Sequence, residues 1–202
     1  MLLALAWVGF RVAASGPTLD EIGLRPSAIV NDYWVLSVAV LLAVAAALLA
    51  AHYHTLHPPF ANTRPERHAG EYLVWALAQQ FILQDFFLTR LLRLMPTTSA
   101  AVLTAAGLFA SAHIPNPLLV AATMVWVVIS CTLFLLYRDL LTLGIAHALL
   151  GLSLAFTLPA PLHHQMRVGL GYVRWQPEQV QPSQNGASVQ NGMPILGTQS
   201  VR

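Results

Sequence analysis

The stretch WALAQQFILQDFFLTR, residues 75–90, decides how this sequence has to fold. It belongs to the apolar run 71–93, and about 20 apolar residues are enough for a helix to cross a bilayer. The run nevertheless contains polar side chains, which are costly inside a membrane unless they face other helices or a polar cavity. These side chains are Gln79, Gln80, Gln84, Asp85 and Arg90. The stretch therefore predicts a membrane helix bundle with a polar interior.

The composition also indicates a membrane protein. Of the 202 residues, 56% are hydrophobic and only 9% are charged, whereas an ordinary soluble domain has about 25% charged residues. The basic residues do not form the clustered face that nucleic acid binding needs, so we expect no nucleic acid partner. The single cysteine, Cys131, lies in an apolar run, which excludes a disulfide framework and a cysteine-based metal site.

Apolar runs predict an all-α, polytopic helix bundle with about six transmembrane helices. The runs long enough to span the membrane unaided are 33–52, 71–93, 117–137 and 139–158. The Ala-rich run 99–114 needs support from its neighbours, and residues 1–15 are a short first helix or, alternatively, a cleaved signal peptide. Prolines fall at the predicted helix ends, and Pro96 followed by Thr97 supplies a break and then a cap.

The bundle is expected to occupy residues 1–175. Residues 176–202 are polar and rich in turn formers, without a periodic apolar face, so we expect a disordered tail. Arginines divide evenly between the two sides of six predicted spans. The positive-inside rule therefore leaves the orientation in the membrane open.

The glutamine-bearing run has a polar face that must point into the bundle. Gln80 and Gln84 are four residues apart and project from one side of the helix, with Gln79 about 100° around from Gln80. Asp85 lies about 140° from Gln80 on a regular helix. At membrane depth its carboxylate has to pair, take up a proton or lie near a water-filled cavity.

Two later helices each carry one histidine among small residues. In LFASAHIP, residues 108–115, His113 shares a face with Phe109, and in LTLGIAHALLG, residues 141–151, His147 shares a face with Gly151. Small residues let helices approach closely, and near the two histidines they are Gly107, Ser111, Gly144 and Ala148. We therefore expect His113 and His147 to come together, although a lone membrane histidine can also serve only as an interhelical hydrogen-bonding group.

A further polar group follows the last predicted span. It consists of His163, His164 and Arg167. These side chains either cap the mouth of a polar cavity or bind lipid phosphates at the membrane interface, and the sequence does not choose between the two.

The three motifs, in this order and at these separations, resemble the CPBP family of intramembrane proteases, which includes the CAAX prenyl endopeptidases and the bacterial Abi proteins. Gln80 and His113 are 33 residues apart, and His113 and His147 are 34 apart. The resemblance covers about residues 20–158 and includes DEIGLRPS, residues 20–27. It implies a helical bundle whose polar cavity opens towards one face. In that family a glutamate and histidines activate a water against a peptide bond, and we expect neither a metal nor another cofactor.

The family's motifs are carried over only where this sequence matches them. Its EExxxR motif falls on Gln79, Gln80 and Gln84, and its FxxxH motif is matched in full by Phe109 and His113. The third motif's histidine is His147, with Gly151 where asparagine is usual. A glutamine amide has no useful basicity, so neither Gln79 nor Gln80 can act as a general base. The histidines can, because neutral imidazole titrates at a pH of about 6.5.

The sequence thus predicts a CPBP-type intramembrane endopeptidase-like protein, integral to the bacterial inner membrane, that acts on an unidentified peptide or membrane protein. The expected catalytic residues are His113, His147, Gln79 and Gln80, and the supporting ones are Gln84, Asp85, Phe109 and Gly151. The alternative is a non-catalytic relative that binds a transmembrane or lipidated partner in the same cavity. A histidine-ligated metal enzyme is disfavoured, because it needs several histidine pairs three or four residues apart, and near His147 in sequence the chain offers only the adjacent His163 and His164.

Overall fold

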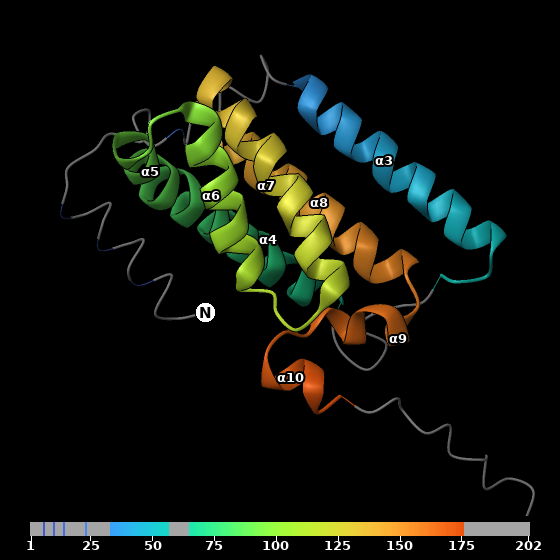
Figure 1. Ribbon diagram of the computed structural model, residues 1–202. Coiled ribbons are helices and arrows are strands. Elements are labelled where there is room, and N and C mark those ends of the chain that lie inside the picture. The colour runs from blue at the N-terminus through green and yellow to red at the C-terminus, as the bar shows by residue number, and fades with distance from the viewer. Residues whose placement is uncertain are drawn as a thin grey trace, which may run out of the picture.

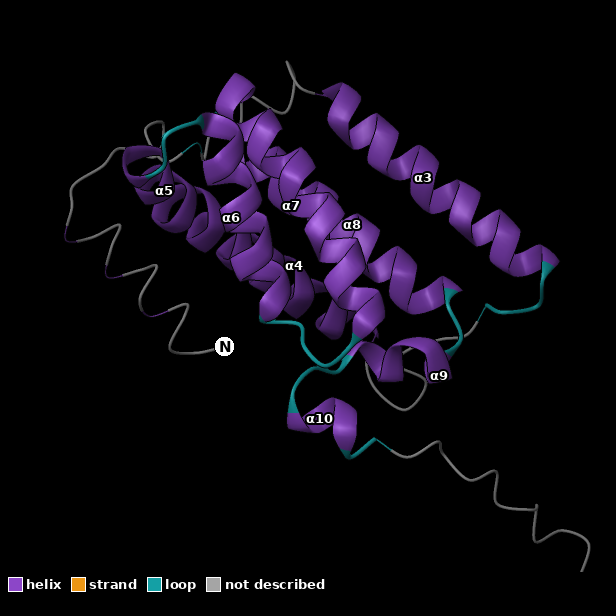
Figure 2. Cartoon of the chain, in the orientation of Figure 1, coloured by secondary structure: helices purple, strands orange, loops and turns teal. Residues whose placement is uncertain are grey.

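A computed structural model describes residues 33–56 and 65–175, together with residues 6, 10, 14 and 23 singly. Every regular element in this part of the chain is a helix, so the expected all-α class is confirmed for it (Figure 2). The predicted first helix or signal peptide at 1–15 lies almost wholly outside the described residues. The predicted tail at 176–202 lies wholly outside them.

The helices follow the predicted apolar runs closely. Their bounds are α3 Tyr33–His52, α4 Pro65–Phe81, η1 Ile82–Leu88, α5 Thr89–Leu94, α6 Thr98–Ser111, α7 Pro117–Tyr137 and α8 Leu140–Thr157. Three short helices follow: α9 Ala160–His163, η2 His164–Met166 and α10 Leu170–Val173. Helices α4, η1 and α5 form one uninterrupted helical segment, so the apolar run 71–93 lies inside a single rod, as predicted.

Three of these helices, α3, α7 and α8, are long and apolar enough to cross a membrane, whereas α6 is apolar but shorter. Helix α3 also leaves a face of large apolar side chains exposed. That face includes Val40, Leu41, Val44, Leu48 and Leu49. An exposed apolar surface of this extent would favour association in water, but in a bilayer it contacts lipid chains. The chain is therefore a membrane protein.

Helix α8 lies at the centre of the bundle. It packs against α3 on one side and against α4 on the other, while α6 packs along α7 (Figure 1). The turn between α7 and α8 is only two residues long, because Arg138 takes a left-handed conformation and Asp139 caps α8 at once. Asp139 Oδ1 accepts a hydrogen bond of 3.0 Å from the Thr142 amide. The short turn makes α7 and α8 antiparallel neighbours.

The helix starts carry the caps that hydrogen-bonding rules require. Thr97 Oγ1 accepts a 3.2 Å bond from the Ala100 amide, so the predicted cap after Pro96 is confirmed. Asn116 caps α7 in the same way, accepting from the Leu119 amide at 3.2 Å. Pro117 occupies the first turn of α7, where its missing N–H costs nothing.

A π-helical segment interrupts the stretch that carries the glutamines. In η1 the amide of Thr89 donates to the carbonyl of Gln84, five residues earlier. A π-helical turn holds more residues than an α-helical turn, so the angle of about 140° expected between Gln80 and Asp85 on a regular helix does not apply here. Such segments frequently occur at functional sites.

Small residues on α8 allow α4 to come close, as the sequence predicts. A Cβ atom on Gly144 would overlap Leu77 Cδ2 and lie 3.3 Å from Leu77 Cα. The expected role of Gly107 in helix approach is wrong, because a Cβ atom there would have no described heavy atom within 4 Å. The contact of Leu77 with Gly144 sets the distance between α4 and α8.

Substituting Gly144 by alanine is expected to lower the free energy of unfolding by about 1–3 kcal/mol, because the new methyl group displaces Leu77 in a packed helix contact. Unfolding in dodecyl maltoside, followed by circular dichroism, measures the change. Gly107→Ala is the matched control, since it adds the same group where space is open. Equal destabilisation by the two substitutions would show that the α4–α8 contact is not tight.

Candidate functional site

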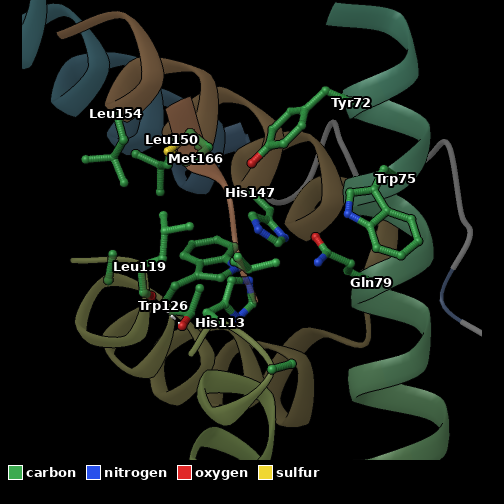
Figure 3. A pocket seen from close by; sticks show the side chains of 15 residues that line it. Tyr72, Trp75, Gln79, His113, Leu119, Trp126, His147, Leu150, Leu154 and Met166 are labelled. Atoms are coloured by element: carbon green, nitrogen blue, oxygen red, sulfur yellow. Dashed lines mark hydrogen bonds between the residues drawn. The ribbon is translucent and has the colours of Figure 1, made fainter. Parts of the chain in front are cut away.

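A cavity of about 290 Å³ lies between α4, α7 and α8 (Figure 3). Its size is close to the lower limit of about 300 Å³ for small-molecule pockets, so it can hold a short segment of a peptide. The wall is mostly apolar, with a few polar groups. It is formed by Tyr72, Trp75, Gln79, Ala112, His113, Leu119, Ala122, Thr123, Trp126, His147, Leu150, Gly151, Leu154, Met166 and Val168.

The cavity brings together residues from all three predicted motifs. His113 follows the end of α6, His147 and Gly151 belong to α8, and Gln79 belongs to α4. Figure 3 shows Gln79 pointing from α4 into the cavity towards His147. The expectation that His113 and His147 come together holds to this extent, since both form part of one cavity wall.

Gln80 and Gln84 lie behind the cavity wall and join several helices by hydrogen bonds. Both side chains are fully buried. Gln80 Nε2 is 3.2 Å from His147 Nδ1, and Gln84 Nε2 donates to Gln80 Oε1 at 3.2 Å and to Ser130 Oγ at 3.4 Å. The bond between the glutamines confirms that they share a helix face. We call the series Ser130, Gln84, Gln80 and His147 the amide relay.

With the amides oriented as they are in the structure, the amide relay determines the tautomer of His147. An amide nitrogen can only donate, so His147 Nδ1 must accept the bond from Gln80 Nε2. The proton of the neutral imidazole is then on Nε2. His147 therefore offers the cavity a hydrogen-bond donor.

His113 has the opposite tautomer. Its Nδ1 is 3.0 Å from the Phe109 carbonyl oxygen, which can only accept, so Nδ1 carries the proton and Nε2 keeps its lone pair. The Phe109 ring lies against the imidazole, with 5.3 Å between ring centroids, which confirms that the two residues share a face. His113 therefore offers an acceptor, and the two histidines have complementary functions.

Asp85 does not belong to the cavity wall. It is half-buried in η1, and its Oδ2 atom is buried without a hydrogen-bond partner. No carboxylate lines the cavity within the part of the chain that the structure describes. In the same residues no three His, Cys, Asp or Glu side chains are grouped so that they could hold a metal ion.

The segment after α8 closes one end of the cavity. His164, Gln165 and Met166 all have left-handed backbone conformations, with φ of 47°, 53° and 58°. This turn directs the chain so that Met166 and Val168 join the cavity wall. Three consecutive left-handed non-glycine residues are strained, so contacts elsewhere must hold the segment in place.

Two hydrogen bonds fasten this segment beside the loop that follows His113. The Gly169 amide donates to the Ile114 carbonyl at 3.0 Å, and Asn116 Nδ2 donates to the Arg167 carbonyl at 3.2 Å. The His164 ring stacks on Tyr172 and Trp175, with centroid distances of 3.9 and 4.5 Å. His164 and Arg167 do not line the cavity, so both roles predicted for these side chains stay predictions. The His163 side chain lies outside the described residues.

Sequence reasoning missed several residues of the wall, above all Tyr72. The signal was present, because Tyr72, Trp75 and Gln79 follow the i, i+3, i+7 spacing of one helix face. From α7 it missed Thr123 and Trp126, and the Trp126 ring lies 5.8 Å from the His147 ring. An apolar helix offers no contrast that would distinguish these positions from lipid-facing ones.

Fold and cavity together define the class: a polytopic helical membrane protein with a cavity that is lined by two histidines. Comparison of the chain with family models, with curated proteins and with solved structures gives no match. Membership of the CPBP family therefore stays a prediction that rests on the three motifs.

Proposed function

We propose that this chain is a CPBP-type intramembrane endopeptidase-like protein, with about six spans in a bacterial inner membrane. It hydrolyses a peptide bond within or near the bilayer, and His113 and His147 act on the substrate. The observation that supports the proposal is that both histidines line one cavity and offer it one acceptor and one donor.

The complementary tautomers suggest a hydrolytic step without a carboxylate. A water donates its proton to His113 Nε2 as its oxygen attacks the carbonyl carbon of the substrate. The carbonyl oxygen, which gains negative charge, accepts a hydrogen bond from His147 Nε2–H. His113 then returns the proton to the amide nitrogen as the C–N bond breaks. General acid–base catalysis of this kind accelerates reactions by about 10² to 10⁴-fold.

The wall of the cavity suits an apolar substrate segment. The polar groups are surrounded by apolar side chains, namely Trp75, Trp126, Leu150 and Leu154. Apolar side chains of a transmembrane segment could bind this surface, because they have no hydrogen-bonded water to give up. The Gln79 amide offers both a donor and an acceptor to the backbone of an extended peptide.

The test uses purified protein in phosphatidylethanolamine–phosphatidylglycerol vesicles with a set of quenched-fluorescent single-span peptides. His113→Ala and His147→Ala are each expected to reduce cleavage by about 10²-fold while helix content stays unchanged. His52→Ala is the control, since His52 is exposed at the end of α3 and does not line the cavity. Undiminished cleavage by folded His113 and His147 variants would overturn the proposal.

A second candidate is a non-catalytic protein that binds a transmembrane or lipidated partner in the same cavity. The absence of a carboxylate from the described cavity wall favours it, because the two motif glutamines cannot act as bases. In that case the wild-type protein binds single-span peptides in the same vesicles and leaves them intact. Photo-crosslinking with mass analysis of the peptide distinguishes the two functions.

A further inference from the structure

The Tyr72 hydroxyl is a polar group of the cavity that no predicted motif includes. Tyr72 lies in the middle of α4, and its side chain reaches across to α8 (Figure 3). The hydroxyl points into the cavity on the side of His147, and Figure 3 draws no hydrogen bond from it to the other residues shown. A tyrosine hydroxyl in an apolar wall is available to bind a polar atom of a ligand.

Gly151 makes the room that this hydroxyl occupies. A Cβ atom on Gly151 would overlap Tyr72 Oη and lie 2.9 Å from Tyr72 Cζ. Any other residue at position 151 would place its own side chain in that space. Gly151 has no polar side chain, but the Tyr72 hydroxyl from α4 lies directly in front of it.

The position of the hydroxyl relative to His147 suggests its role. Gly151 follows His147 by one turn on the same face of α8, and residues so spaced have Cβ atoms about 5–6 Å apart. The Tyr72 hydroxyl, which lies against Gly151, therefore belongs to the same part of the cavity wall as His147. Two fixed donors on one wall can hold a carbonyl oxygen and stabilise the charge that develops on it.

We propose that the Tyr72 hydroxyl, together with His147 Nε2–H, hydrogen-bonds the carbonyl oxygen of the peptide bond bound in the cavity, and that Gly151 admits it to that position. The inference rests on the proposed function and adds a catalytic residue to it. The hydroxyl keeps its proton throughout, so it adds no proton transfer to the hydrolytic step. Its contribution is largest when the carbonyl oxygen becomes negative.

The experiment compares Tyr72→Phe, Gly151→Ala and the double variant in the vesicle assay with single-span peptides. Tyr72→Phe is expected to lower kcat by about 10²-fold with little change in KM, because the lost bond is strongest in the transition state. Gly151→Ala moves the hydroxyl out of place and should lower kcat by a similar factor. The double variant should be no slower than either single one. Gly107→Ala is the control, since it adds the same methyl group where space is open, and it should leave kcat unchanged.

A wild-type kcat in Tyr72→Phe overturns the inference while the proposed function stands. Multiplied losses in the double variant overturn it too, because they would mean that Gly151 does not act through the hydroxyl. If the wild-type protein cleaves none of the peptides, the proposed function fails separately, and binding of the same peptides then tests Tyr72. Tyr72→Phe should weaken that binding by about fivefold, the effect of one neutral hydrogen bond. Equal affinities would overturn the inference in that case.

Discussion

Substituting Gln80 by glutamate is expected to slow peptide hydrolysis by about 10²-fold, as His147→Ala does, through the loss of a fixed hydrogen-bond donor to the developing oxyanion. This is so although the CPBP pattern has glutamate at that position. Gln80 is fully buried behind His147 and does not line the cavity, so a carboxylate there cannot reach a water beside the substrate. A carboxylate only accepts, and His147 Nδ1 must then carry the proton. His147 Nε2 would lose its hydrogen and could no longer donate to the substrate.

Nitrogen-15 spectra of histidine-labelled protein measure this change directly, because protonated and unprotonated ring nitrogens resonate at different shifts. The His147 signals of Gln80→Glu should show that the proton has moved from Nε2 to Nδ1. The His113 signals should stay the same, since the Phe109 carbonyl holds that tautomer. Faster hydrolysis by Gln80→Glu would contradict the role given to His147.

The same change one residue earlier is expected to have the opposite effect. Gln79 lines the cavity and points towards His147 (Figure 3). A glutamate at position 79 would face the water directly and could accept its proton, and a positioned general base increases the rate by about 10³-fold. Gln79→Glu should therefore hydrolyse the single-span peptides faster than the wild-type protein, and the gain should disappear at acid pH as the carboxylate takes up a proton.

Gln79→Leu is the control for this prediction, because it removes the amide without adding a base and should give no gain. A rate for Gln79→Glu that equals the wild-type rate would mean that the attacking water does not lie beside residue 79. Together, the two glutamate variants distinguish the residue that faces the substrate from the residue that holds the histidine.

The bounds of the longest helices could be predicted from the sequence because membrane spans give a strong and simple signal. The runs predicted at 33–52 and 117–137 coincide with α3 and α7, since an apolar run ends where a proline or a charged residue begins. The π-helical segment η1 could not be predicted, because its backbone pairing depends on how the surrounding helices pack. The predicted count of six spans depends on helices that are short. Among the described residues three helices have the length and composition of a span, and α6 is apolar but shorter.

The membership of the cavity was predictable only in part. His113 and His147 stand out because polar residues are rare in apolar helices, and Gly144 and Gly151 indicate where helices meet. Gln79 and Gln80 could not be assigned different roles, although about 100° of helix rotation separates them. The rotation of α4 decides which of them faces the cavity, and that rotation depends on contacts such as Leu77 against Gly144.

The hydrogen bonds of the amide relay that join the two glutamines and His147 all run the same way, each amide nitrogen donating to the next group towards His147. The Gln84 amide nitrogen donates to the Gln80 oxygen, and the Gln80 amide nitrogen donates to His147. Turning the Gln80 amide over alone would bring two NH2 groups face to face, and turning the Gln84 amide over alone would bring two carbonyl oxygens face to face. The amides can reverse only together, from the Ser130 end on α7 to His147 on α8. A buried series of neutral groups across three helical segments thus makes His147 a hydrogen-bond donor towards the cavity, a task that needs no charge inside the membrane.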